Sequence, residues 1–255
     1  MTTGTLAPCA SLRGPARLLL GGQLLHVAVT QFHAGGDAND HHAIFEAYAR
    51  DRIWAAVHLG QFAATAILLA GLMSLSLALD DRDATKGRVG RLGAASAVAA
   101  LALYGVLQAV DGVALKQAVS AWASAPEAEK AARFAVAESV RWLEWGLRSY
   151  QDVAMGLSLL LLSLAALRAG RLPQPVAGLM GLSGASYLAQ GWVAGTEGFS
   201  PAQSVAIVLG WVLSLSWMIW LVAATWRLPA SGALGATQVD PVKGGRSEGG
   251  FAEAG

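Results

Sequence analysis

The stretch "WAAVHLGQFAATAILLAGLMSLSLAL", residues 54–79, contains no Asp, Glu, Lys or Arg. A helix needs about 20 mainly apolar residues to cross the hydrocarbon core of a bilayer, so this stretch predicts a transmembrane helix. Five more segments of similar length are largely apolar. They are residues 16–32, 89–112, 145–167, 176–194 and 204–226.

Composition supports the same fold class. Hydrophobic residues make up 55% of the 255-residue chain and charged residues only 14%, whereas a soluble domain carries about a quarter charged residues. The net charge of +1 argues against a nucleic-acid partner. The single cysteine, Cys9, excludes an internal disulfide and a thiolate metal site. We therefore predict an all-α integral membrane bundle of six transmembrane helices, with the lipid bilayer as its surroundings.

Basic residues predict the orientation of this bundle. Eleven of the 18 Lys and Arg residues lie on one side of the predicted bundle, at or next to the same ends of the six segments. They are Arg13, Arg17, Arg82, Lys86, Arg88, Arg91, Arg168, Arg171, Arg227, Lys243 and Arg246. The positive-inside rule places these parts, and hence both termini, in the cytoplasm, with the chain in the inner membrane. Residues 1–15 form a cytoplasmic N-terminal segment and residues 16–226 the transmembrane domain. Residues 227–255, rich in Gly, Ala and Ser, are expected to be a disordered cytoplasmic tail.

The outer connections are then residues 33–53, 113–144 and 195–203. The first predicts a short helix that starts near Asp40, with Asn39 or Asp40 as its cap, and that has an apolar face. That face consists of Ile44, Phe45 and Tyr48. The second connection is predicted to form two amphipathic pieces broken at Pro126.

Polar residues recur at spacings of three and four within the apolar segments, and they lie mainly in the outer half of each. Examples are His26, Thr30 and His33 in and just after the first segment. Further stripes comprise His58, Gln61 and Thr65, then Tyr104, Gln108 and Asp111. Because ionisable groups avoid lipid, this pattern predicts one polar pocket that opens outward and is closed by apolar inner halves.

Histidines and carboxylates dominate this outer region. Imidazole and carboxylate ligands suit zinc, iron, copper or manganese, although the spacing matches no established metal signature. The metal-ligand candidates are His33, Asp37, His41, His42 and Glu46. His26 and His58 lie at similar depths on consecutive antiparallel helices, so they are candidates to bind a transition metal or a haem. The alternative is that the loop histidines are ordinary interfacial residues.

The run "ESVRWLEWGLRSYQD", residues 138–152, carries the other chemical candidates. Arg148 could hold an anionic or carbonyl group of a substrate, while Glu144 or Asp152 exchanges protons. These three residues are the catalytic candidates. The alternative is that the charges neutralise one another along the helix. Asp111 and Lys116 could form a similar pair at the rim.

The segment "NDHHAIFEAYARDRIWAAVHLGQF", residues 39–62, resembles one found in uncharacterised bacterial multi-span integral membrane proteins. The matching positions are Asn39, Asp40, His41, Trp54, Val57 and His58. The resemblance implies a bacterial membrane protein and imports no activity.

The leading hypothesis is a metal- or haem-dependent membrane enzyme that acts on a small or lipophilic substrate in an outward-facing His/carboxylate/Arg pocket. A small-solute transporter and a non-catalytic membrane subunit or scaffold are the alternatives. The sequence leaves open whether the protein is an enzyme.

Overall fold

A computed structural model describes residues 10–79 and 84–227, and within these ranges every regular element is a helix. The elements are α1 (Ala10–Thr30), α2 (His41–Arg50), α3 (Trp54–Leu79), α4 (Ala84–Ala109), η1 (Val110–Leu115), α5 (Lys116–Ala123), α6 (Glu127–Ala169), α7 (Gln174–Glu197) and α8 (Pro201–Arg227). The prediction of an all-α fold is confirmed for this part of the chain. The expected disordered tail, and most of the N-terminal segment, lie outside the described residues.

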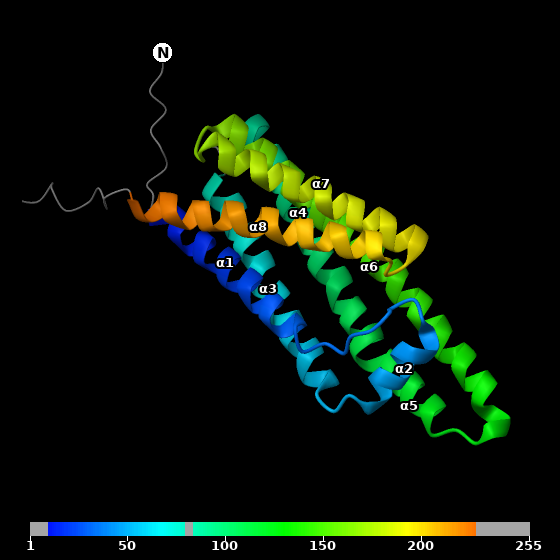
Figure 1. Cartoon of the computed structure of the whole chain (residues 1–255). Coiled ribbons are helices and arrows are strands. Elements are labelled where there is room, and N and C mark those ends of the chain that lie inside the picture. Colours follow the sequence, from blue (N-terminus) through cyan, green and yellow to red (C-terminus); the bar gives the residue numbers. More distant parts are fainter. Residues whose placement is uncertain (1–9, 80–83, 228–255) are drawn as a thin grey trace, which may run out of the picture.

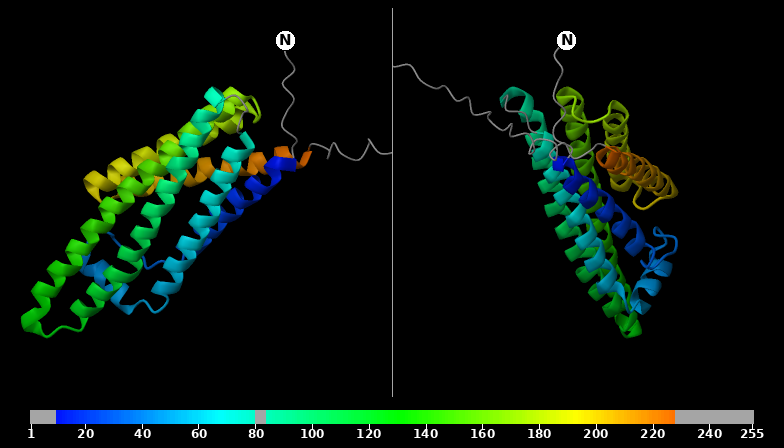
Figure 2. Two further views of the ribbon diagram at one scale, coloured as in Figure 1. Left: turned by 180° about the vertical axis from the view of Figure 1, so that it is seen from behind. Right: turned by 90° about the vertical axis from the view of Figure 1, so that its left-hand side faces the viewer.

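Six long helices form a closed ring. Helices α1, α3, α4, α6, α7 and α8 each contact the next one, and α8 returns to α1 (Figures 1 and 2). The ring closes beside the two ends of the described chain, where Arg13 Nε donates a hydrogen bond to the carbonyl of Thr225 at 3.2 Å. Each of the six predicted apolar segments therefore corresponds to one helix of the ring.

Four of these helical stretches are long and apolar enough to cross a membrane. They are Trp54–Leu79, Gly87–Ala123, Glu127–Ala169 and Pro201–Trp226. The remaining two, α1 and α7, are 21 and 24 residues long but more polar, because α1 carries Arg13, Arg17 and His26 and α7 is rich in Gly and Ser. The chain is thus a membrane protein with four candidate spans among its six ring helices.

The second outer connection differs from the two separate amphipathic pieces that the sequence predicts. Helix α4 continues through η1 into α5, and α6 runs for 43 residues, about 65 Å, from Glu127 into the bundle. Pro126 stands directly before α6, as the sequence predicts, because proline cannot continue a preceding helix. The two pieces are therefore extensions of long helices that project beyond the ring (Figure 1).

Helix α2 lies across this extension. The Asp40 carboxylate caps it by accepting a hydrogen bond from the Ala43 N–H at 3.1 Å, which confirms one of the two predicted caps. The predicted apolar face is also confirmed, since Ile44, Phe45 and Tyr48 are buried. They pack in one cluster with Trp54, Leu115, Val119, Trp122 and Ala137. Helix α2 is thereby held over the outer end of the ring.

The inner half of the ring is filled by apolar side chains. Leu19, Leu69, Leu72 and Leu162 are fully buried there, and Trp217 joins them from α8. This packing leaves the polar residues of the helices gathered toward the end covered by α2.

Candidate functional site

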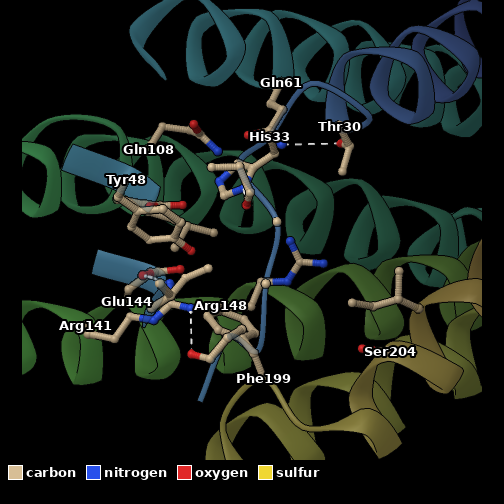
Figure 3. A pocket seen from close by; sticks show the side chains of 18 of the residues that line it. Thr30, His33, Tyr48, Gln61, Gln108, Arg141, Glu144, Arg148, Phe199 and Ser204 are labelled. Carbon is tan, nitrogen blue, oxygen red and sulfur yellow. Dashed lines mark hydrogen bonds and ion pairs between the residues drawn. The ribbon is translucent and has the colours of Figure 1, made fainter. Parts of the chain in front are cut away.

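A cavity of about 380 Å³ lies at the outer end of the ring, beneath the segment that connects α1 to α2. Figure 3 shows Arg148 reaching into its middle, with His33, Tyr48 and Gln108 on one side and Phe199 and Ser204 on the other. All of the ring helices except α7 contribute lining residues. A polar cavity is therefore present at this end of the ring, and the side of the membrane that it faces stays a prediction.

Asp111 enters this cavity from a local distortion of a helix. It is the second residue of η1, a π-helical turn between α4 and α5, and such turns are often found at functional sites. The wider turn is stabilised from α3, where the indole N–H of Trp54 donates to the Asp111 carbonyl at 3.2 Å. The π-helical turn therefore fixes the direction in which the Asp111 carboxylate points.

His33, His58 and Asp111 form a compact group of possible metal ligands, which we call the metal trio. One potential ligand atom from each residue lies within 4.8 Å of the others. His58 Nε2 is 3.0 Å from Asp111 Oδ2, and the rings of His33 and His58 are 5.1 Å apart. Residues from three separate parts of the sequence thus converge at one point.

Backbone carbonyls fix the tautomers of both histidines. His33 Nδ1 lies 3.0 Å from the carbonyl of Ala34, and His58 Nδ1 lies 2.8 Å from that of Trp54. In each pair the nitrogen must donate, which leaves Nε2 without a proton in the neutral ring. Burial lowers the pKa of His33, which favours this neutral form. A carbonyl partner on one ring nitrogen is the usual support of a histidine that binds metal through the other.

Two buried atoms of the trio lack hydrogen-bond partners among the described residues. His58 Nε2 is close to the Asp111 carboxylate, but the geometry of that contact does not make a hydrogen bond. Asp111 Oδ1 is likewise unsatisfied. His58 Nε2 and Asp111 Oδ2 form an ion pair when the imidazole is protonated, and a metal cation held by both groups would stabilise the same buried contact. Two imidazoles and one carboxylate form a donor set suited to a divalent transition metal.

The structure brings only one of the five predicted loop ligands, His33, into this trio. His41 instead contacts Glu138 at 2.8 Å, and the ring of His42 stacks on Phe134. Glu46 forms an exposed ion pair with Arg50 at 2.8 Å. Asp37 accepts a hydrogen bond from the Asn39 N–H at 3.1 Å, within its own turn.

The two histidines predicted to share a cofactor have different neighbours. His58 belongs to the metal trio. His26 Nδ1 is 3.3 Å from Thr65 Oγ1, and its ring contacts Tyr104 and Trp211 edge-on. A haem between them stays a prediction.

The charged residues of α6 are paired in the way the alternative interpretation expects, although three of them also line the cavity. Arg141 and Glu144 form a buried ion pair at 2.6 Å. Arg148 Nε donates to the fully buried Asp152 at 2.9 Å. Arg141, Glu144 and Arg148 line the cavity, whereas Asp152 is not among its lining residues.

The proposed rim pair of Asp111 and Lys116 is replaced by two separate interactions. Lys116 Nζ donates to the carbonyls of Tyr48, Ala49 and Asp51, where α2 ends, and Asp111 faces His58. Helical spacing could not reveal this, because η1 inserts a wider turn between the two residues. One sequence feature did indicate that Asp111 belongs to the pocket, namely that it shares a polar stripe with Tyr104 and Gln108.

Comparisons with known proteins give a family and no activity. No curated protein and no solved structure shows significant similarity to the chain. One family model matches residues 84–224, which include Asp111, Glu144 and Arg148 but not His33 or His58. Because the match covers more than half of the chain, the protein belongs to the family described as a domain of unknown function, DUF4386.

Proposed function

We propose that this protein binds a divalent first-row transition metal at His33, His58 and Asp111 within the membrane, as the centre of an enzyme. The convergence of three ligand atoms within 4.8 Å, with both imidazoles oriented by backbone carbonyls, carries the proposal. Three protein ligands leave coordination positions free, which is typical of catalytic rather than structural metal sites.

The metal would act as a Lewis acid and lower the pKa of a bound water, which suits hydrolysis of a small or lipophilic substrate. Glu144 lines the same cavity and is the proposed group for proton exchange, with Arg141 holding its carboxylate in place. Arg148 and Asp152 are proposed to contribute on the substrate side.

The proposed topology has six spans with both termini in the cytoplasm of a bacterial inner membrane. The closed ring of α1, α3, α4, α6, α7 and α8 supports six spans, because each long helix contacts the next one in the ring. Basic residues such as Arg13, Arg88 and Arg171 mark the end of the ring opposite the cavity. The cavity would then face outward.

The fully buried leucines below the cavity favour this one-sided pocket over a path through the protein. A transporter would need polar or interrupted inner halves in some of its helices. We therefore rank the enzyme above the small-solute transporter.

Metal analysis of the detergent-purified protein tests the proposal. The unaltered chain should retain about one Zn²⁺ or Co²⁺ after desalting, whereas His58→Gln and Asp111→Asn should each retain little. His42→Gln is the matched control, because His42 is an exposed histidine outside the trio. Equal metal content in all four proteins would refute the proposed site, and a Soret band lost in His26→Ala would support haem binding instead.

A further inference from the structure

Arg148 has unused hydrogen-bonding capacity in the cavity. Its Nε is bound to Asp152, but none of the described residues accepts a hydrogen bond from its two terminal amino groups. Figure 3 shows this guanidinium directed into the middle of the cavity. A guanidinium held at Nε in this way offers its outer edge to a ligand.

Arg141, the other arginine of the cavity, has a different setting. Its terminal nitrogens donate to Glu144 and to the carbonyl of Ala38, and its guanidinium lies over the ring of Phe199 at 4.6 Å. These contacts tie the α1–α2 connection to α6. Arg141 is therefore a structural residue, and Arg148 is the cation that remains available.

The charges around the cavity favour an anion once a metal is bound. Arg141 with Glu144 and Arg148 with Asp152 form two neutral pairs. A divalent metal beside the Asp111 carboxylate adds a net positive charge. A ligand that contacts both the metal and Arg148 therefore gains most if it is an anion with several oxygens, so that one oxygen can reach the metal while others accept from the guanidinium.

The remaining wall of the cavity is apolar. It includes Leu107, Ile207, Val208 and Trp211. A volume of about 380 Å³ has room for an anionic group and an attached organic part.

We infer that the cavity binds the phosphate group of an organic phosphate, between the Arg148 guanidinium and the metal, with the organic part against the apolar wall. This inference rests on the proposed metal site. The phosphate could belong to a soluble molecule or to a lipid headgroup, and both present the same chemistry to the cavity.

Titration of Co²⁺-loaded, desalted protein tests the inference. Inorganic phosphate, butyl phosphate and butyrate are added in turn, and binding is followed by calorimetry and by the visible spectrum of the bound Co²⁺. Butyl phosphate should bind roughly tenfold more tightly than inorganic phosphate, because its chain buries apolar surface. Metal-free protein should bind either phosphate far more weakly.

Replacing Arg148 alone would leave Asp152 buried without its partner, so the double variant Arg148→Gln/Asp152→Asn is used. It should keep Co²⁺ and bind butyl phosphate roughly ten- to hundredfold more weakly. Arg133→Gln is the matched control, since Arg133 forms an exposed pair with Glu129 elsewhere on α6. It should bind butyl phosphate like the unaltered chain.

Unchanged phosphate binding in the double variant, or butyrate bound as tightly as butyl phosphate, would overturn the inference and leave the metal site standing. Protein that takes up no Co²⁺ would overturn the metal site and the inference with it. Nanodiscs with and without phosphatidic acid distinguish the sources. Competition between phosphatidic acid and butyl phosphate supports a lipid headgroup, and binding of butyl phosphate without competition supports a soluble phosphate.

Discussion

A Cβ atom added at Gly112 would lie 2.9 Å from the Cβ of His58 and 3.1 Å from its Cγ. Real Cβ atoms do not approach other atoms so closely, so η1 can lie against α3 at this point only because residue 112 is glycine. This close approach brings Asp111, the preceding residue, to the imidazole of His58. The geometry of the metal trio therefore depends on a residue that binds nothing itself.

We predict that Gly112→Ala lowers metal affinity at least tenfold. The added methyl group must push η1 away from His58 and separate two of the three ligands, at a cost of about 1–3 kcal/mol from overpacking. Co²⁺ titration measures the affinity. Gly105→Ala is the control, because its new Cβ would meet only the ring of Phe62, at 3.6 Å. Equal affinity in both variants would show that the close approach is not needed.

Lys116, at the start of α5, should determine how stably α2 is attached to the rest of the bundle. Its ammonium group accounts for three hydrogen bonds to carbonyls at the end of α2 and just beyond it, so Lys116→Met leaves those carbonyls without this donor. We expect amide hydrogen exchange in residues 43–50 to become about tenfold faster while exchange in α3 is unchanged. Arg50→Met removes an exposed cation and its ion pair with Glu46 from α2 itself, and it should raise these rates by no more than about twofold.

The buried pair of Arg141 and Glu144 should respond differently to single and double substitution. Arg141→Met leaves the Glu144 carboxylate buried without its partner and should lower the free energy of unfolding by about 3–5 kcal/mol. The double variant Arg141→Met/Glu144→Leu replaces both charges by apolar groups and should recover a large part of that loss. Thermal unfolding in detergent measures these two variants and Glu144→Leu alone. A double variant whose loss of stability equals the summed losses of Arg141→Met and Glu144→Leu would contradict the prediction.

Most of the fold could be predicted from the sequence because long apolar segments leave a chain few choices in a membrane. The capped helix α2 could also be predicted, since Asp40 and the spacing of Ile44, Phe45 and Tyr48 are local signals. The metal trio could not be predicted as a group. His33, His58 and Asp111 are far apart in sequence, and the π-helical turn that orients Asp111 changes the phase on which helical spacing arguments depend.

His41 and His42 lie outside the metal trio for a related reason, although they cluster with His33 in the sequence. His41 and His42 follow each other in sequence and therefore point in different directions from α2, one to Glu138 and the other to Phe134. Clustering in sequence indicates a shared site only when the residues also share a helical face. His33 continues the polar face of His26 and Thr30 in the sequence pattern, and among the loop histidines it is the one that lines the cavity.

The number of spans can be decided by cysteine labelling in a Cys9→Ala background, which removes the one native cysteine. Single cysteines are introduced at the exposed positions Ser11 and Arg168 at one end of the ring, and Glu127 and Thr196 at the other. A membrane-impermeant maleimide applied to intact bacterial spheroplasts should label Glu127→Cys and Thr196→Cys directly. It should label Ser11→Cys and Arg168→Cys only after permeabilisation, because six spans place α1 and α7 across the membrane. If only the four more apolar stretches crossed and Glu127→Cys were labelled, Thr196→Cys would be protected and Ser11→Cys would be labelled. A four-span chain in the opposite orientation would instead protect Glu127→Cys, so the four positions together distinguish six spans from four.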